Sequence, residues 1–246
     1  MIDPVFERKV KEFRKATGAI LPPDAFVDVR VVGPGEKVRH HDTQRARSWT
    51  RNFYNMATAA VAYLKGSGVS NFGAGHINVK DAGEGAFDAG HIHYGSGYSV
   101  HITNALGFNA DAAMATKGIV VGSGDTAFSA DQHVLDNKIL HGSLVGRLSY
   151  GACSTSAPVY DSSEGAEKWT VRITRNFTNL YNGDPVVVKE TGLVVTGSVY
   201  PFVDGSSQAS LMLERCILDV PASVAFQDVL SIEYVIELDF SAIDAD

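Results

Sequence analysis

The sequence predicts a mainly β protein, an antiparallel β-sandwich or jelly roll with one or two packed helices and a basic N-terminal helical arm. Residues 230–240 place an apolar side chain at every even position and, except for Val235, a polar one at every odd position, as a strand with one buried face does. Elsewhere, short apolar runs are separated by turn-forming residues, and the chain holds 24 Gly against 8 Pro. Its 246 residues, 45% hydrophobic and 20% charged, suffice for a large core without disulfides or metal.

We expect residues 1–25 to form the N-terminal helical arm and residues 26–246 a single β-sandwich domain. Asp3 suits the N-cap of the helix, Pro4 its first position, and Gly18 the position after its end. The other residues of this helix are largely cationic around a narrow apolar stripe, so it must lie on its own body or on a neighbour. The stripe consists of Val5, Phe6, Val10 and Phe13.

A strand and a second helix follow. Alternation over residues 26–32 predicts the strand. Asp42 or Thr43 can cap the helix, which would run to Gly66 and form the main buried helix. Its apolar side chains recur at helical spacing and are Trp49, Phe53, Met56, Ala60 and Leu64.

Residues 66–117 form a glycine-rich insertion in which no periodicity persists. A structureless loop of this length is unusual inside a compact domain, so we expect short strands or order supplied by a partner. The fragments 72–78 and 87–93 are similar across a 15-residue offset, which suggests a local hairpin duplication rather than a repeat architecture.

Strand patterns return after Lys117. Residues 119–121 are a short buried run, and Ser129 with Gln132 could form the capping box of a brief helix ending near Lys138. Further on, the alternation predicts a strand with one apolar face formed by Trp169, Val171 and Ile173.

The last third of the chain continues this strand pattern. Asn182-Gly183 is a strong hairpin signal. It is followed by apolar runs at 186–188 and 193–195, and by a strand over 211–220. Together with the alternating final strand, these elements complete the predicted sandwich.

The net charge of −7 is unevenly distributed. Residues 1–51 hold eleven Lys and Arg against seven Asp and Glu, whereas residues 52–246 hold ten against twenty-one. The difference reflects either two solvated faces of different sign or a basic arm that docks on an acidic surface of a neighbouring copy or another protein. An acidic body repels phosphate, so nucleic acid is not an expected partner. No apolar run is long enough for a bilayer, and the N-terminus lacks the pattern of a signal peptide.

The sequence contains no recognisable catalytic motif, so we expect no catalytic residue, no cofactor and no enzymatic activity. Residues 122–125 resemble a phosphate loop but lack its GK[ST] ending, and a turn is expected there. Residues 142–146 have the wrong order for a nucleophile elbow. Cys153 and Cys216 lack the surroundings of a nucleophile and are expected to be small core residues.

Histidine is the one residue type that suggests a site. On a strand, His91 and His93 would point to the same face and could ligate one metal ion. Two ligands are too few in a monomer, but a three-fold axis would supply six. The simpler interpretation is two loop histidines that form hydrogen bonds with nearby backbone.

Three parts of the sequence resemble a widespread family of structural proteins associated with the virions of tailed bacteriophages. They are RSWTRNFYN at 47–55; GIVVGSGDTAFS at 118–129, leading to LDNKI at 135–139; and ITRNFTN at 173–179, continuing through VVVKETGL at 186–193. The similarity covers roughly 45–65 and 117–195, and residues 83–117 look like an insertion relative to it.

This resemblance implies a viral structural protein made in the host cytoplasm and incorporated into the virion. The function it favours is capsid decoration or cementing, or another head-associated role. The partners would be copies of the chain itself, for example in a trimer, and the major capsid protein. The alternatives are a tail or fibre-attachment protein that contacts a host surface or glycan and, least favoured, a jelly-roll enzyme.

Overall fold

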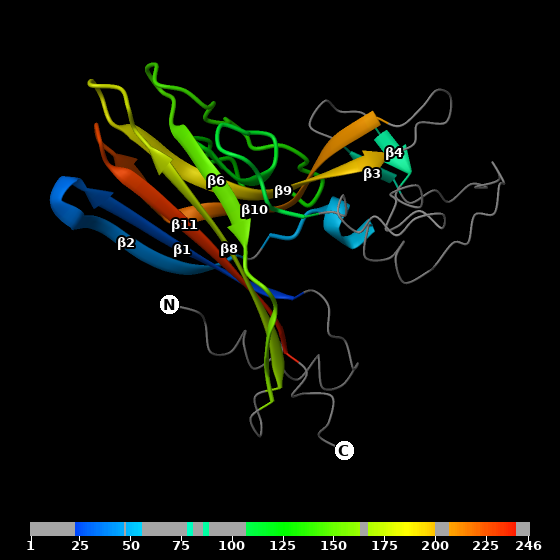
Figure 1. Cartoon of the computed structure of the whole chain (residues 1–246). Coiled ribbons are helices and arrows are strands. Elements are labelled where there is room, and N and C mark those ends of the chain that lie inside the picture. Colours follow the sequence, from blue (N-terminus) through cyan, green and yellow to red (C-terminus); the bar gives the residue numbers. More distant parts are fainter. Residues whose placement is uncertain are drawn as a thin grey trace.

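Two antiparallel sheets packed face to face form the body of the protein, which confirms the predicted mainly β, sandwich-like fold (Figure 1). The computed structural model describes residues 23–46, 48–55, 78–80, 86–88, 107–162, 167–199 and 207–239. The elements are β1 (Asp24–Gly33), the 3-10 turn η1 (Pro34–Glu36), β2 (Lys37–Ala46), β3 (Asn78–Lys80), β4 (Ala86–Asp88), β5 (Gly118–Gly122), β6 (Ser149–Thr155), β7 (Val159–Asp161), β8 (Lys168–Thr178), β9 (Val186–Val199), β10 (Ser207–Val224) and β11 (Val229–Asp239).

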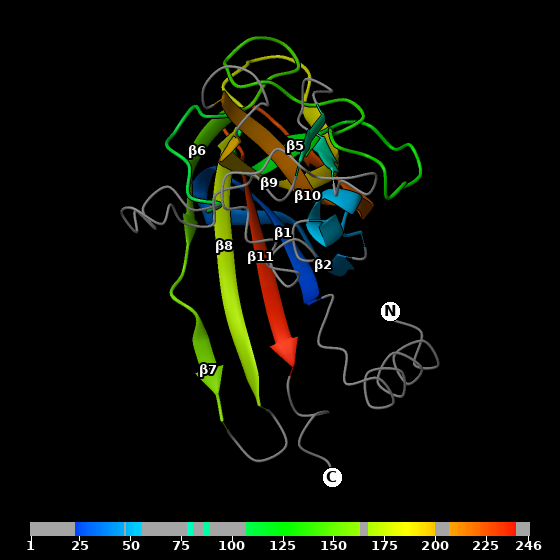
Figure 2. The same cartoon turned by 90° about the vertical axis from the view of Figure 1, so that its right-hand side faces the viewer.

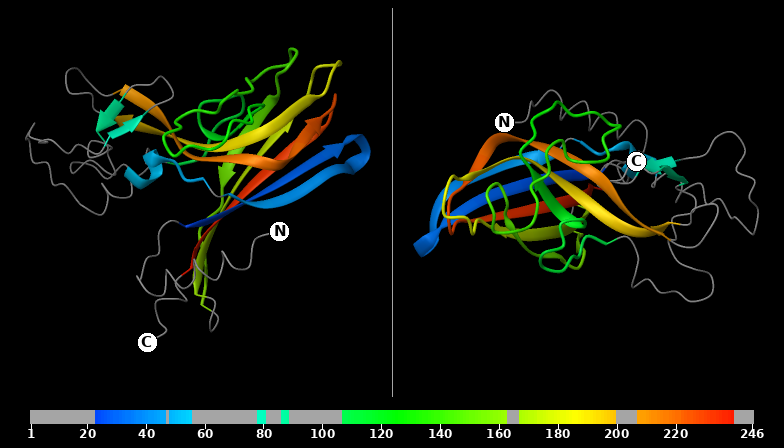
Figure 3. Two further views of the ribbon diagram at one scale, coloured as in Figure 1. Left: turned by 180° about the vertical axis from the view of Figure 1, so that it is seen from behind. Right: turned by 90° about the horizontal axis from the view of Figure 1, so that it is seen from above.

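The larger sheet, called sheet A, has the order β2-β1-β11-β8-β6, and β7 also pairs with β8. Sheet B has the order β10-β9-β5, and β3 and β4 form a separate two-stranded pair. Strands β10 and β5 of sheet B pack against sheet A. The view from above in Figure 3 shows the two layers.

Alternation along the strands of sheet A creates the core between the sheets. The predicted strand at 26–32 lies within β1, where every second side chain, including Val27 and Val29, is buried. The predicted last strand is β11, in which Leu230, Ile232 and Tyr234 are fully buried. In sheet B, the predicted run at 119–121 forms β5, buried over its whole length.

The two ends of sheet A differ. At one end lie η1 and the turns before β6, after β8 and before β11, because Thr178 pairs with both Ser149 and Val229. At the other end, β7 and the first half of β8 extend away from the body beside the end of β11 (Figure 2). The views in Figures 1 and 3 show that β9 and β10 leave the body in another direction.

The predicted helix starting at Asp42 or Thr43 is wrong, because both residues lie in β2. Residues 37–46 pair along β1, and this ladder satisfies the backbone that the prediction assigned to a helix. Within the predicted helix, α-helical structure is described over 51–55, whereas residue 47 and residues 56–66 lie outside the described residues. Trp49 is nevertheless buried, and its ring lies 4.2 Å from that of Phe53.

The predicted helix after Ser129 is absent from residues 129–138, all of which are described. The Gln132 side chain does accept a hydrogen bond from the Ser129 N–H, as in a capping box. However, Gln132 also accepts one from buried Arg215, so the segment is held as a loop over sheet B.

The predicted hairpin at Asn182-Gly183 is also wrong, because β8 belongs to sheet A and β9 to sheet B. The turn therefore carries the chain from one sheet to the other. The runs at 186–188 and 193–195 are parts of one strand, β9, and the predicted strand 211–220 lies within the longer β10.

Much of the glycine-rich insertion, and the N-terminal arm up to residue 22, lies outside the described residues. Within the insertion, β3 and β4 confirm the expectation of short strands, and they pair antiparallel from Asn78 opposite Asp88. Residues 107–117 are described as well and run along the sandwich to β5.

Candidate functional site

Several ionisable side chains are buried in the body of the protein. Glu190 on β9 and Arg215 on β10 are fully buried, with Arg215 Nε 2.7 Å from Glu190 Oε2. The Glu190 carboxylate also accepts backbone N–H groups from Gly124 at 3.1 Å, Asp136 at 3.2 Å and Asn137 at 2.9 Å. Four donors thus balance the buried charge, which makes this carboxylate an anchor for the loop that covers sheet B.

Two glycines let that loop approach so closely. A Cβ atom at Gly122 would lie 2.3 Å from Glu190 Oε1, and one at Gly124 would lie 2.5 Å from the Asp136 Cβ. Residues 122–125 begin at the end of β5 and do not form a phosphate loop. Their role is to surround the carboxylate of Glu190, and the sequence pattern did not indicate it. The arrangement resembles anion binding by backbone N–H groups, with the anion supplied by the chain itself.

A second buried acid, Glu214, lies between the two sheets. The Tyr234 hydroxyl of sheet A donates a 2.6 Å hydrogen bond to its Oε2, and its Oε1 has no partner among the described residues. Burial raises the pKa of Glu214 to about 8, an effect that the Tyr234 hydrogen bond and the charge of Arg215 partly oppose. Glu214 therefore carries a proton at neutral pH.

Arg175 on β8 organises the loop before β5 and the start of β6. Its guanidinium donates to five backbone carbonyls, those of Asp111, Met114, Lys117, Ile119 and Gly151, at 2.7 to 3.3 Å. It also lies 4.8 Å from the centroid of the Tyr150 ring. Arg175 belongs to the 173–179 segment that carries part of the resemblance, and the sequence pattern did not indicate this role.

These buried groups do not form a substrate site. Arg175, Glu190, Glu214 and Arg215 are at most 1% exposed, so a substrate in solution cannot reach them. Burial raises the pKa of the Cys153 thiol, which disfavours the nucleophilic thiolate. Cys153 and Cys216 are both buried in the hydrophobic core, which confirms them as core residues.

The histidines with metal-ligand spacing, His91 and His93, lie outside the described residues. Within the described part of the chain, no group of three His, Cys, Asp or Glu side chains is placed to hold a metal ion. His41 lies on β2 with its Nε2 2.7 Å from Asp28 Oδ2, and Thr43 donates to the same oxygen. That contact is an exposed side-chain pairing between neighbouring strands.

The projecting end of sheet A is the candidate interaction site. We call it the tongue, and it comprises β7, residues 168–172 of β8 and residues 235–239 of β11. Cross-strand pairing places five side chains on one face: Tyr160, Trp169, Val171, Ile236 and Leu238. This face continues that of the core residues Ile173 and Tyr234, one pair further along the same ladder.

Part of this apolar face is uncovered. Trp169 is 40% exposed and Tyr160 is 47% exposed, and their rings lie 5.1 Å apart. Because β9 and β10 leave the body in another direction, these two strands of sheet B do not cover this part of sheet A (Figures 1 and 3). An exposed aromatic patch next to a core is typical of interaction sites.

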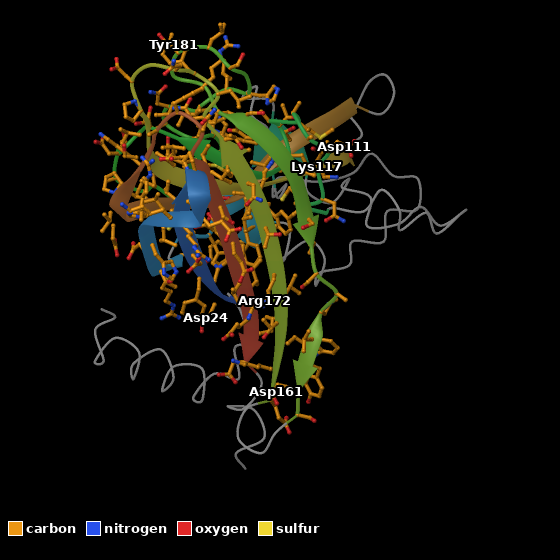
Figure 4. The ribbon with its side chains drawn as sticks, turned by 60° about the vertical axis from the view of Figure 1, so that its left-hand side comes forward. Asp24, Asp111, Lys117, Asp161, Arg172 and Tyr181 are labelled. Carbon is orange, nitrogen blue, oxygen red and sulfur yellow. The ribbon has the colours of Figure 1, made fainter. Side chains whose placement is uncertain are left out.

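The opposite face of the tongue is charged. Lys168 pairs with Glu237 at 3.1 Å, and Arg172 pairs with Glu233 across the same two strands. Figure 4 shows Asp161 at the far end of the tongue and Arg172 nearer the body, with Tyr181 at the opposite end of the molecule. Because the tongue projects from the body with one apolar and one charged face, we interpret its apolar face as a contact surface.

A smaller apolar site lies at the other end of sheet A. In the turn that precedes β6, Leu144 is 61% exposed and Val145 is 67% exposed. These two side chains and the tongue thus lie at opposite ends of the sandwich.

Comparisons with known proteins find no match among family models, curated proteins or solved structures. In the described part of the chain, no helix has the length and apolar character needed to cross a membrane.

Proposed function

We propose that this chain is a structural virion protein of a tailed bacteriophage, a head-associated component that decorates or cements the capsid by assembling with copies of itself and with the major capsid protein. The observation that carries the proposal is the tongue, whose apolar face extends beyond the sandwich with Tyr160 and Trp169 exposed. Exposed apolar sites at opposite ends of a molecule suit contacts between unlike surfaces, which build rings and arrays.

The buried charges support the same proposal. Glu190, Arg215 and Arg175 form their hydrogen bonds with loops and with one another, so these ionisable groups stabilise the fold. The resemblance of residues 45–65 and 117–195 to virion-associated phage proteins supports a phage particle as the place where this chain assembles.

The direct test is the number of copies of this chain in purified particles of the phage that encodes it, measured by quantitative mass spectrometry. A capsid decoration protein is present in hundreds of copies, on the order of the number of capsid subunits, whereas a neck, tail or fibre protein is present in about a dozen or fewer. A purified chain that stays a monodisperse monomer and does not associate with particles would contradict the proposal.

A charge substitution in the tongue gives a second test. Trp169→Glu places a charge on the apolar face and should abolish association with particles, because burying an unpaired charge is costly. Val159→Glu is the matched control, since Val159 is 63% exposed and its neighbour Tyr160 points to the opposite face. Equal association of both variants would exclude the tongue as the contact.

The Tyr160–Trp169 pair favours a second candidate, a tail or fibre-attachment protein that binds a host surface or glycan. Exposed aromatic rings bind the apolar faces of ligands while their polar edges remain in water. Labelled protein that binds host cells but not capsids, with binding lost in Trp169→Glu, would favour this candidate over decoration.

A further inference from the structure

The turn between β8 and β9 contains Asn182-Gly183, the only Asn-Gly pair in the chain. Such a pair is typical of type I′ hairpin turns, in which both central residues have positive φ. Here neither residue has a positive φ, and the turn carries the chain from sheet A to sheet B. The hairpin conformation therefore does not account for the pair.

Residues 182–184 form an exposed bend next to Tyr181, at the end of the molecule opposite the tongue (Figure 4). The Asn182 side chain has no hydrogen bond with the described part of the chain. The Gly183 N–H donates to the Tyr181 carbonyl at 3.0 Å, across a three-residue turn. A single exposed hydrogen bond of this kind opens easily, because water replaces the lost partner.

The residues on both sides of the bend are held in place. Asn179 is buried, and its Nδ2 donates a 2.9 Å hydrogen bond to the Val224 carbonyl. The Tyr181 N–H donates to Asn179 Oδ1, also at 2.9 Å. On the other side, buried Val186 pairs with Val224 in the ladder between β9 and β10. The bend can therefore change conformation while the sandwich stays intact.

Glycine at position 183 leaves the nitrogen that follows Asn182 unshielded, because it has no side chain. A Cβ atom at this position would lie 2.3 Å from Cε1 of the Tyr181 ring. Any other residue would therefore cover the nitrogen and also press against that ring.

We propose that Asn182 deamidates spontaneously in the folded protein, through attack by the Gly183 nitrogen on its side chain. The nitrogen loses its proton and forms a bond with Cγ of Asn182, while the bond between Cγ and Nδ2 breaks. Nδ2 takes up a proton and leaves as ammonia, and a cyclic succinimide remains. Water then opens the ring at either carbonyl and yields aspartate or isoaspartate, so the only co-reactant is water.

The reaction would change the end of the molecule opposite the tongue. Either product adds a negative charge to a chain with a net charge of −7, two residues away from exposed Leu180 and Asp184. Isoaspartate also adds one methylene to the backbone between the two anchored segments. A contact that buries this end would be weakened as the protein ages, since a buried unpaired charge is costly.

Three exposed asparagines of the same chain serve as internal references. Asn109, Asn137 and Asn176 precede Ala, Lys and Phe, whose side chains shield the following nitrogen. Asn109 Oδ1 accepts a hydrogen bond from the Thr155 N–H, and Asn137 Nδ2 donates one to Ser123 Oγ. Asn176, like Asn182, has no side-chain hydrogen bond with the described part of the chain.

Peptide mapping by mass spectrometry tests the proposal on the purified, folded chain after incubation at mildly acidic and mildly alkaline pH. Deamidation is detected by the mass gained when the amide NH2 is replaced by OH, and isoaspartate by labelling with an isoaspartate methyltransferase. Gly183→Ser is the matched variant, because it retains Asn182 and adds a side chain beside the attacking nitrogen. Thermal unfolding verifies that this variant is folded.

We expect Asn182 to deamidate several times faster than Asn176, to yield isoaspartate as well as aspartate, and to react faster at alkaline pH. Gly183→Ser should slow the reaction several-fold. Equal rates at Asn182 and Asn176 would overturn the proposal. So would aspartate without isoaspartate, or a rate unchanged in Gly183→Ser, because both results mean hydrolysis without the cyclic intermediate.

A synthetic peptide of residues 178–187 separates the chemistry of the pair from the effect of the fold. If the peptide deamidates while Asn182 of the folded chain stays intact, the turn protects the pair and the proposal is wrong. Comparable rates in the peptide and the folded chain would support it. The reaction needs no phage particle, so neither result depends on the proposed assembly function.

Discussion

Tyr234 of sheet A donates its hydroxyl hydrogen to Oε2 of Glu214 of sheet B across 2.6 Å, in the middle of the core. The hydrogen bond joins the two layers of the sandwich through an acid that burial keeps protonated. Because Glu214 has a pKa of about 8 here against 4.5 in water, folding is linked to a proton.

The linkage predicts a pH-dependent effect of Glu214→Gln. The unfolded chain releases the Glu214 proton above pH 4.5, whereas the folded chain retains it up to about pH 8. The favourable contribution is therefore complete below pH 4.5 and is lost progressively up to pH 8. Between pH 4 and pH 7, the Gln variant should gain about 3 kcal/mol of unfolding free energy relative to the parent, at about 1.4 kcal/mol per pH unit.

Urea denaturation at several pH values measures this difference. Tyr234→Phe is the companion variant, because loss of its hydrogen bond raises the Glu214 pKa further and should extend the decline in stability above pH 8. A stability difference between parent and Glu214→Gln that does not vary with pH would contradict the linkage.

Arg175→Lys should destabilise the protein strongly. Lysine cannot reach the five carbonyls that the guanidinium satisfies, so buried acceptors lose their donors at a cost of about 3 kcal/mol or more. The loop at 108–118 should also become sensitive to trypsin at Lys117. Arg172→Lys, on the same strand but exposed, is the control and should change stability by about 0.5 kcal/mol or less.

The Glu190–Arg215 pair should show strong coupling in a double-mutant cycle. Glu190→Gln alone leaves Arg215 as a buried charge without its counter-ion, and Arg215→Met alone strands the carboxylate, at about 3–5 kcal/mol each. The double variant should be more stable than the sum of the two losses implies. Additive losses would mean that the pair does not act as a unit.

Gly124→Ala should loosen the loop over sheet B. The added methyl would lie 2.5 Å from the Asp136 Cβ and 2.8 Å from Glu190 Oε1, so the loop must move and weaken its hydrogen bonds with Glu190, at about 1–3 kcal/mol. Gly146→Ala is the control for backbone strain, because its φ of +68° is unfavourable for alanine but the space around it is open. Thermal unfolding should rank Gly124→Ala as the more damaging change.

Local patterns in the sequence determined the strands with one buried face. The alternation at 26–32 and 230–240 predicted β1 and β11, since a period of two depends only on neighbouring residues and on which face meets the core. The same local reasoning identified buried Trp49 and the strand after Lys117. It also located the apolar stripe of residues 4–17 and the uneven distribution of charge along the chain.

The tertiary structure alone decided which strands pair and which charges are buried together. Asn182-Gly183 looks like a hairpin turn, but β8 finds its partners in β11 and β6, so the turn crosses between sheets. Residues 37–46 became a strand because the edge of β1 was available to them. Glu190 contacts Arg215 and the 122–137 loop only through long-range packing. The apolar face of the tongue is exposed because sheet A extends beyond the strands of sheet B. Such features depend on contacts between distant parts of the chain, which no local period encodes.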